Sequence, residues 1–256
     1  MQSITLEQYE QLQPSAAIEV KGKKIVYNTP NRHTAWRVQT LFSKEPDTIE
    51  WINGFEPGST LLDIGANVGM YSVFAAALRG CHVHAFEPES QNFALLNRNI
   101  FSNRLGDLVT AYPVALSDGF GFDKLHLSQF VAGGSCHNFG EAADFDGRPF
   151  TPRFSQGCIA IAVDDLIEKH GLPVPDYIKV DVDGIEHKVI AGARRLLESG
   201  KVRSVLIEIN TNRGDHRDTV ATMESMGYRW SPEQVEKAQR TEGAFKGVGN
   251  YIFVRA

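Results

Sequence analysis

The sequence has few of the features that mark secreted, membrane-spanning or nucleic-acid-binding proteins. Its three cysteines, Cys81, Cys136 and Cys158, are far apart and odd in number, which predicts neither a disulfide framework nor a zinc site. No apolar run approaches the ~20 residues of a membrane span, and the polar N-terminus lacks the apolar core of a signal peptide. The formal net charge is −5 and the basic residues are scattered, so no nucleic-acid partner is expected. These absences favour a soluble protein of the reducing cytoplasm, without a membrane partner.

What the sequence does have is apolar residues in a regular pattern. They make up 42% of its 256 residues, enough for one large α/β domain. From residue 60 onward, short apolar runs alternate with helical stretches, which predicts a parallel sheet with helices on both faces. A glycine-rich stretch precedes the last run, so the final strand is expected to be antiparallel to its neighbour. The predicted strands are 61–64, 82–86, 109–115, 178–182, 205–209 and 251–255, and the predicted helices are 71–78, 93–101, 186–197 and 215–226.

Two parts of the chain lie outside this alternation. Residues 1–58 are predicted to form an N-terminal cap, and residues 59–256 to form the main domain. Within that domain, residues 117–155 have many glycines and phenylalanines but no clear period. They are too many for an ordinary connection, so we expect a functional lid or a small insertion. The cap is predicted to contain a hairpin of strands 18–20 and 24–28, followed by helices 34–42 and 47–53.

The strongest chemical signal is the segment LLDIGANVG, in which an apolar strand leads into a glycine turn. Asp63 lies at the end of the strand, and Gly65 and Gly69 flank Asn67 in the turn before a helix. Glycine allows positive φ and lets the backbone approach a ligand closely. Glu87 ends the next strand, about 20 residues after the first glycine, where an acidic group can bind ribose hydroxyls. The pattern is typical of a nucleoside-binding site at the carboxyl edge of the sheet.

The spacing of these residues separates two classes of cofactor. A dinucleotide site expects G-x-G-x-x-G, with a diphosphate at the helix N-terminus. Here the glycines fall as G-x-N-x-G, and the carboxylate of Asp63 precedes them. That carboxylate would repel a diphosphate but suits the cationic methionyl group of S-adenosylmethionine. A glycine turn alone is a weak signal, but Asp63 and Glu87 at strand ends favour S-adenosylmethionine as the cofactor.

Two later strands also end in polar residues that we expect at the same edge of the sheet. Glu186 has a plainer interpretation as an acidic group at a helix N-terminus, and His187 as an exposed helix residue. His137 and His216 have no motif around them, and a surface role is expected for each. The candidates are Asp181, Asp183, Glu186 and His187 after one strand, and Glu208 and Asn210 after the next.

Together these segments resemble the FkbM family of methyltransferases. The matching text runs in order from residue 45 to residue 210 and reads EPDT, LLDIGANVGMYS, AFEPES, VALSD, YIKVDVDGIEHKVIAGA and VLIEIN. The resemblance implies a Rossmann-like α/β fold of class I methyltransferases, with a mostly parallel seven-stranded sheet and an antiparallel last strand. It also implies methyl transfer from S-adenosyl-L-methionine to a hydroxyl of a small molecule, polyketide or sugar.

The resemblance and the residue patterns together give a set of candidate site residues. Some family members carry glutamate where this chain has Asp183, and residues 117–155 have no firm counterpart, so the acceptor stays open. The cofactor candidates are Asp63, Gly65, Ala66, Asn67, Gly69, Glu87, Pro88, Ala115 and Asp181, the catalytic candidates are Asp181, His187 and Glu208, and the substrate candidates are Asp183, Glu186 and Asn210.

An alcohol acceptor needs its oxygen aligned with the methyl donor and its proton removed. Alignment contributes up to ~7–11 kcal/mol in ideal cases, and the base is expected to be Asp181 or His187. A divalent ion bound by Asp181, Asp183 and Glu208 is an alternative way to activate the hydroxyl, but we do not expect one. A nucleotide-dependent oxidoreductase is disfavoured by the glycine spacing, and a non-catalytic binding module by the intact cofactor residues.

Overall fold

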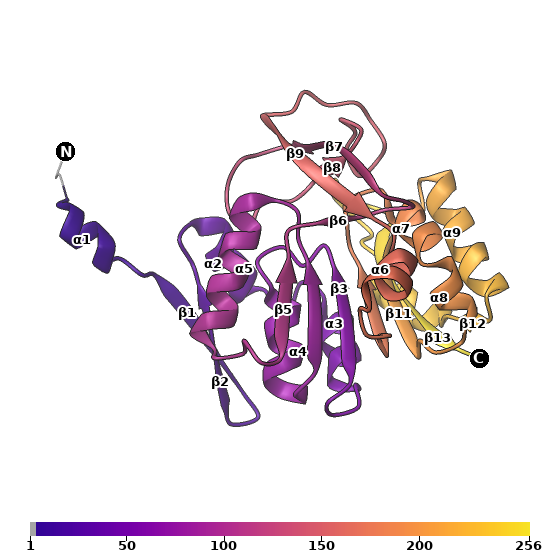
Figure 1. The fold of residues 1–256 in the computed structure, drawn as a ribbon, viewed down its shortest axis with the longest axis horizontal. Coiled ribbons are helices and arrows are strands. Elements are labelled where there is room, and N and C mark those ends of the chain that lie inside the picture. The colour runs from indigo at the N-terminus through magenta and orange to yellow at the C-terminus, as the bar shows by residue number, and fades with distance from the viewer. Residues whose placement is uncertain (1–3) are drawn as a thin grey trace.

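A seven-stranded sheet forms the centre of the structure, a computed structural model that describes residues 4–256 (Figure 1). Its strands along the chain are β3 (Thr60–Ile64), β4 (His82–Phe86), β5 (Val109–Tyr112), β10 (Tyr177–Val180), β11 (Ser204–Asn210), β12 (Tyr228–Arg229) and β13 (Val248–Arg255). They lie in the order β12-β13-β11-β10-β3-β4-β5. The strands β11, β10, β3, β4 and β5 are parallel, and β13 is antiparallel to both of its neighbours. The predicted Rossmann-like α/β fold with an antiparallel last strand is confirmed.

Successive residues of a strand point to opposite faces of a sheet. Both faces of this sheet carry apolar side chains, and helices cover both. In β3, Leu61 packs into the core on one face and Leu62 into the core on the other. All four residues of β10 are buried, as expected of a strand covered on both faces. The first face is covered by α4 (Met70–Arg79) and α5 (Ser90–Ser102), and the second by α6 (Val163–His170), α7 (Glu186–Gly192), α8 (Arg194–Glu198) and α9 (Gly214–Ser225).

The N-terminal residues form the predicted hairpin, which packs against α4 and α5, the helices that cover the first face of the sheet. The Tyr27 hydroxyl donates to the carbonyl oxygen of Met70 over 2.8 Å, and the Asn28 N–H donates to the Asn99 side chain over 2.7 Å. The hairpin therefore shares a core with α4 and α5, and the boundary near residue 58 stays a prediction. The elements are α1 (Leu6–Gln11), β1 (Ser15–Val20), β2 (Lys23–Asn28), α2 (Arg32–Gln39) and α3 (Pro46–Asn53).

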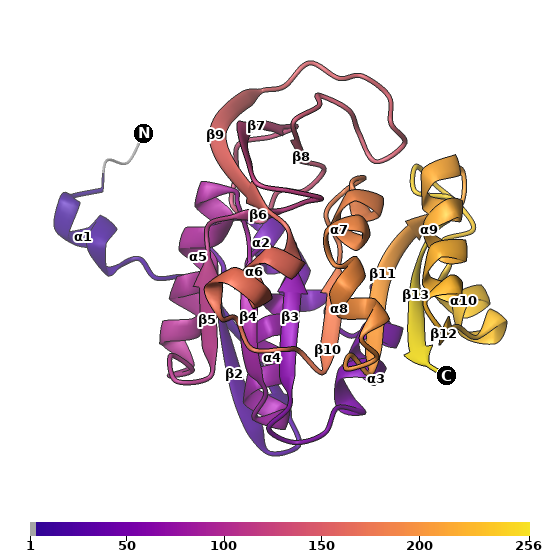
Figure 2. The same ribbon diagram turned by 45° about the vertical axis from the view of Figure 1, so that its right-hand side comes forward.

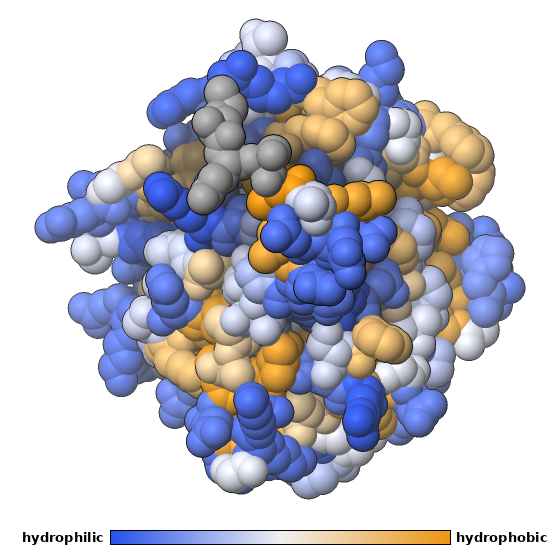
Figure 3. All heavy atoms as spheres, turned by 90° about the vertical axis from the view of Figure 1, so that its left-hand side faces the viewer, coloured by the Kyte–Doolittle hydropathy of each residue, from blue (hydrophilic) through white to orange (hydrophobic). Residues whose placement is uncertain are grey.

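Helix α1 stands away from the rest of the chain (Figure 1). Thr5 caps its N-terminus through a capping box with Gln8, but none of its residues is buried. The side chains of Ile4, Leu6 and Leu12 are exposed, and Figure 3 shows hydrophobic side chains gathered beside the N-terminus on this face. The short helix is therefore held by its cap and not by packing.

The stretch predicted as a lid or insertion, residues 117–155, contributes to a second sheet. Its strands are β6 (Ala115–Leu116), β7 (Gly121–Leu127), β8 (Asn138–Phe139) and β9 (Phe154–Ile161), in the order β6-β9-β7-β8. Figure 2 shows this sheet above the carboxyl ends of the parallel strands. The predicted strand 109–115 is wrong at its end, because Pro113 has no N–H for the ladder and β5 stops before it. Ala115 therefore lies in the second sheet.

Other predictions differ from the structure in detail. The predicted helix 186–197 is two helices, α7 and α8, which meet at Ala193. The predicted helix 34–42 ends at Gln39. The elements α6, β12 and α10 (Pro232–Ala238) are absent from the prediction. No helix among residues 4–256 is long and apolar enough to cross a membrane.

Candidate active site

A cavity of about 460 Å³ lies at the carboxyl edge of the parallel strands, between that edge and the second sheet. Residues that follow the parallel strands form one side, and residues of the second sheet and its loops form the other. The N-terminal helices and the chain before β13 supply the rest of the wall. The lining includes Gly65, Asn67, Glu87, Pro88, Asp181, Asp183 and Glu208 from the strand ends, Ala115, Leu125, Cys136, His137 and Phe139 from the second sheet and its loops, and Trp36, Arg37, Lys44, Arg240 and Phe245 from the remaining segments.

The glycine turn after β3 has the backbone geometry that its sequence predicts. Gly65, Asn67 and Gly69 have φ values of +79°, +52° and +79°, in the left-handed region. A side chain on Gly65 would overlap the carbonyl oxygen of Asp181, and one on Gly69 would overlap Leu96. These close approaches are to the protein itself, while Gly65 and Asn67 also face the cavity. The glycines therefore fix the shape of the turn against its neighbours.

Asp63 lies behind the cavity wall and not in it. It is 1% exposed, and the Ser72 hydroxyl donates a hydrogen bond to its carboxylate. Burial raises the pKa of Asp63, although Lys179 opposes the shift. Ala66 and Gly69 also lie outside the lining residues. Their place in the structure supports a role in shaping the turn, and direct contact of these three with a cofactor stays a prediction.

Glu87 is a buried carboxyl group at the end of β4. Its Oε2 accepts the Asn67 N–H over 2.7 Å, and its Oε1 accepts the Glu89 N–H over 2.9 Å. Burial raises the pKa of Glu87 to about 7, even though these two backbone donors lower it. Each carboxylate oxygen has a second lone pair, so both remain able to accept a hydroxyl from the cavity side.

Asp181 forms an ion pair with the buried Lys179 at the end of β10. Lys179, whose side chain is 3% exposed, places its Nζ 2.7 Å from Asp181 Oδ2. Burial disfavours both charges, but Lys179 and Lys44 outweigh it and lower the pKa of Asp181. In turn Asp181, Asp63 and Glu45 outweigh the burial of Lys179 and raise its pKa. Asp181 is therefore held as an anion, which suits the binding of a cation better than the removal of a proton.

Asp183 and Glu208 are carboxyl groups whose pKa values are raised. Asp183 has a φ of +60°, and its Oδ2 accepts the Cys136 N–H over 2.7 Å. Burial and the neighbouring Asp181 raise its pKa to about 7. Burial and Asp181 also raise the pKa of Glu208, although Arg240 donates to Glu208 over 3.2 Å and opposes the shift. Such perturbed groups in a cavity are typical of a functional site.

Three charged residues beside the site, Lys44, Glu45 and Arg240, are not among the candidate residues predicted from the sequence. Lys44 Nζ lies 2.6 Å from Glu45 Oε1, and the Tyr71 hydroxyl donates to Oε2 over 2.8 Å. Arg240 lies 3.6 Å from the same Glu45 carboxylate. Glu45 belongs to the segment EPDT, which is part of the family resemblance, so the sequence does contain a signal for it. Lys44 and Arg240 lie in segments without a motif and reach the site only through the fold.

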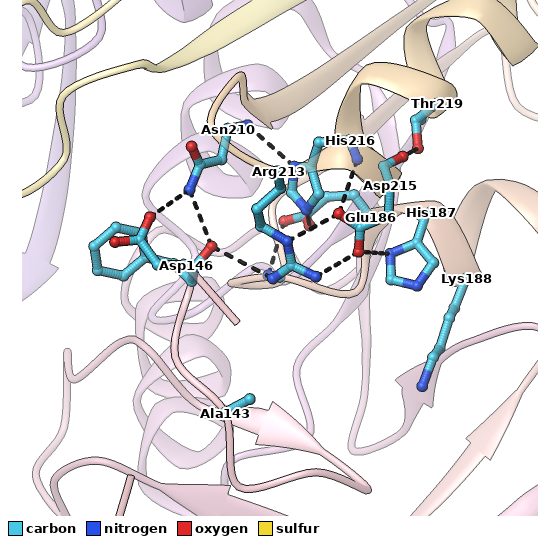
Figure 4. A network of polar contacts seen from close by, with 12 residues as sticks. Ala143, Asp146, Glu186, His187, Lys188, Asn210, Arg213, Asp215, His216 and Thr219 are labelled. Carbon is cyan, nitrogen blue, oxygen red and sulfur yellow. Dashed lines mark hydrogen bonds and ion pairs between the residues drawn. The ribbon is translucent and has the colours of Figure 1, made fainter. Parts of the chain in front are cut away.

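A second polar network lies outside the cavity and includes predicted site residues (Figure 4). Glu186 is 1% exposed, and its Oε1 accepts the backbone N–H groups of Val182 and Gly184 over 3.3 Å and 3.2 Å. Its Oε2 lies 3.1 Å from His216 Nε2. The Asn210 N–H donates to His216 Nδ1 over 3.0 Å, which leaves the His216 proton on the nitrogen that faces Glu186.

His187 lies in this second network and does not line the cavity. Its Nδ1 is 3.4 Å from Asp215 Oδ2, and Arg213 Nη2 is 2.6 Å from the same oxygen. His187, Asp215 and His216 have ligand atoms within 4.8 Å of one another, as in a metal site. The Arg213 cation already neutralises the Asp215 carboxylate, and the two His216 nitrogens face the Asn210 N–H and the Glu186 carboxylate. We therefore assign no metal here, and the predicted role of His187 as the base is not carried further.

Asn210 connects the second network to the insertion and not to the cavity. Its Nδ2 donates to Asp146 Oδ1 over 2.8 Å and to the Phe145 carbonyl oxygen over 3.1 Å (Figure 4). Arg213 donates to the same carbonyl over 3.4 Å. The Phe145 ring stacks on Phe245, which lines the cavity, with 4.4 Å between centroids. The second network therefore anchors the insertion over the cavity.

Comparisons with known proteins indicate the family of this chain. The family model of the methyltransferase FkbM domain matches residues 63–230. A hexuronic acid methyltransferase of Haloferax volcanii is 26% identical over 192 residues, which cover 75% of this chain and 73% of the relative. A 31-O-demethyl-FK506 methyltransferase of Streptomyces tacrolimicus is 28% identical, with 70% of this chain and 75% of that protein covered.

A solved structure is also similar. The crystal structure of a methyltransferase FkbM from Methylobacillus flagellatus aligns with a TM-score of 0.52 and 17% identity. The alignment covers 78% of this chain and 44% of that one, so this chain spans less than half of its length. At such identity the likeness shows the fold alone, whereas the family model matches well over half of the 256 residues. The chain belongs to the FkbM family of S-adenosylmethionine-dependent methyltransferases.

Proposed function

We propose that this protein transfers a methyl group from S-adenosylmethionine to a hydroxyl oxygen of a small molecule, such as a sugar or a polyketide. The observation that carries the proposal is the cavity at the carboxyl edge, which combines the glycine turn, Glu87 and Asp181 in one wall. One relative is named as a hexuronic acid methyltransferase. The other is named as a methyltransferase of 31-O-demethyl-FK506, a name that denotes an oxygen without its methyl group. Both names support a hydroxylated small molecule as the acceptor.

The residues along the strand ends fit the chemical groups of S-adenosylmethionine. Glu87 has lone pairs free to accept ribose hydroxyls, as acidic groups after this strand do in nucleoside sites. Asp181 is held as an anion and suits the cationic methionyl end. When bound, S-adenosylmethionine supplies a methyl group that is already activated for transfer. The task left to the protein is to hold and align the acceptor oxygen and to receive its proton.

The insertion would shape the part of the cavity that receives the acceptor. Leu125 and Phe139 offer apolar contacts, and Arg37 of α2 borders the same space. Arg37 donates to the Gly133 carbonyl oxygen over 2.9 Å and 2.8 Å, so α2 and the insertion are joined across the site. We propose that this second sheet is a lid over the acceptor, a role typical of loops and small additions to such folds.

A divalent ion is not part of the proposal. Asp181 and Glu208, two of its three possible ligands, already have cationic partners in Lys179 and Arg240. The third, Asp183, accepts a backbone N–H. We therefore expect turnover to be the same with and without a chelator.

The function is tested by titration calorimetry followed by methyl transfer. We expect binding of S-adenosylmethionine and no binding of NADH. With methyl-labelled S-adenosylmethionine and a pooled panel of methyl hexuronides, hexoses and macrolide alcohols, label should appear on a hydroxyl oxygen. Binding of NADH instead would support an oxidoreductase, and S-adenosylmethionine binding without any label transfer to the panel would support a binding module. Label on carbon or nitrogen would contradict O-methylation.

A further inference from the structure

His137 is a buried histidine in the loop before β8 whose ring has no hydrogen-bond partner. The residue is 8% exposed and lines the cavity, and neither Nδ1 nor Nε2 is hydrogen-bonded within residues 4–256. A buried polar group left without a partner costs about 1–3 kcal/mol, so each one needs an explanation. Among the residues within 4–256 that have such an atom, His137 is the one that lines the cavity. A ligand bound in the cavity would therefore supply the hydrogen-bond partner that the imidazole ring lacks.

The carboxyl groups of the cavity differ from His137 because each already has a partner. Asp181 and Glu208 are paired with cationic side chains at 2.7 Å and 3.2 Å. Asp183 and Glu87 accept backbone N–H groups. Each of these four carboxyl groups therefore has an ion-pair or hydrogen-bond partner, whereas the imidazole has no hydrogen-bond partner within residues 4–256.

The ring of His137 lies between the two halves of the cofactor wall. A side-chain carbon on Gly134 would be 3.2 Å from His137 Nε2, so this nitrogen lies against Gly134. The Gly134 carbonyl oxygen accepts the Asn67 side chain of the glycine turn over 2.7 Å. On the other side, the Cys136 N–H donates to Asp183 after β10. The loop that carries His137 is thereby joined to the glycine turn and to Asp183, beside the strand ends at which the methyl donor is proposed to bind.

We propose that His137 is the catalytic base, with a bare ring nitrogen that accepts the proton of the acceptor hydroxyl. This assignment rests on the proposed function. The hydroxyl oxygen forms a bond to the methyl carbon with its lone pair while the carbon–sulfur bond breaks. The electron pair of that bond goes to sulfur, the proton goes to the imidazole, and the products are a methyl ether, S-adenosylhomocysteine and a protonated His137.

The protonation state of His137 follows from its surroundings. Burial lowers the pKa of His137 to about 4, the Cys136 backbone opposes the shift, and Arg37 adds to it. At neutral pH the ring is therefore uncharged and keeps one nitrogen free of a proton. Sulfur loses its positive charge as the imidazole gains one, so the net charge of the cavity is unchanged by the reaction.

The test compares His137→Gln and His137→Ala with His126→Ala. His126 lies on β7 of the same second sheet, outside the cavity, where its Nδ1 is 2.9 Å from the Ser155 hydroxyl. Affinity for S-adenosylmethionine is measured by calorimetry, and turnover by label transfer to the acceptor pool described above. We expect both His137 variants to lose ~10²–10⁴ in turnover with unchanged cofactor affinity, and His126→Ala to keep wild-type turnover. Added imidazole should restore part of the turnover of His137→Ala.

The outcomes separate the base assignment from the proposed function. If the wild type labels a hydroxyl and His137→Gln does so equally fast, the base assignment is overturned and the function stands. Failure of imidazole to accelerate His137→Ala also overturns it. If the wild type binds S-adenosylmethionine and labels no hydroxyl, the proposed function fails and the base assignment fails with it.

Discussion

The segment YIKVDVDGIEH supplies two polar networks that face in different directions. Asp181 and Asp183 line the cavity, whereas Glu186 and His187 join the network around α9 (Figure 4). The chain turns sharply between them, with φ values of +60° at Asp183 and +124° at Gly184. The first network borders the cavity, and the second lies outside it and joins α7, α9 and the insertion. Residues that are neighbours in one motif therefore serve two purposes, one for chemistry and one for support.

Breaking the ion pair of the first network should have the largest effect. In Asp181→Asn, the buried Lys179 loses its counter-ion, and removing one partner of a buried pair costs about 3–5 kcal/mol. Urea denaturation should show that loss in the free energy of unfolding, and calorimetry should show weaker S-adenosylmethionine binding. The double variant with Lys179→Met should recover part of the stability. Equal stability of Asp181→Asn and the wild type would show that the pair does not hold the site.

Removing the proposed ribose ligand should have the next largest effect. Glu87→Ala loses hydrogen bonds to two hydroxyls, and charge-assisted bonds contribute ~1.5–3 kcal/mol each, so affinity for S-adenosylmethionine should fall at least tenfold. Calorimetry gives the dissociation constant, with exposed Glu19 of β1 replaced by alanine as the control. Unchanged affinity in Glu87→Ala would remove this residue from the site.

The raised pKa of Glu87 predicts a pH dependence of stability. Its pKa is about 7 in the folded protein and ~4.3 in the unfolded chain, so between these values the folded state holds more protons. Stability of the wild type should therefore fall relative to Glu87→Gln as pH rises through this window, by at most ~1.4 kcal/mol per pH unit. Urea denaturation from pH 4 to pH 8 measures the difference. Parallel curves for the two proteins would contradict the shift.

Breaking the second network at its exposed end should have the smallest effect. His187 is partly exposed beside Asp215, and surface ion pairs contribute about 0–1 kcal/mol. His187→Ala should therefore keep turnover and cofactor affinity near those of the wild type, with little loss of stability. A large loss of turnover with normal cofactor affinity would return His187 to the reaction centre.

The parts of the fold that could be predicted from the sequence are those with local patterns. Three such parts are each encoded within about ten residues, as is usual for a buried strand followed by a turn. They are the strand that leads to Asp63, the glycine turn after it, and the strand that leads to Asp181. The second sheet has no such local signal, because β7 pairs with β9 across a long loop. Pro113 marks the end of β5, but the sequence gives no sign that Ala115 and Leu116 then pair with β9.

The site could be predicted only where a motif and a strand end coincide. Gly65, Glu87 and Asp181 follow that rule and line the cavity. The separation of Asp183 from His187 depends on a positive φ at a residue that is not glycine, which sequence patterns do not reveal. His137 lies in a segment without periodicity, which is held against the glycine turn by a hydrogen bond from Asn67 to Gly134.

A crystal structure of the protein with S-adenosylhomocysteine tests the central claim most directly. Our account predicts the ribose beside Glu87, the homocysteine end beside Asp181, and the sulfur atom facing the space next to His137. A nucleoside bound elsewhere, such as in the groove between α3 and α10 that Trp51 and Gln234 line, would contradict it.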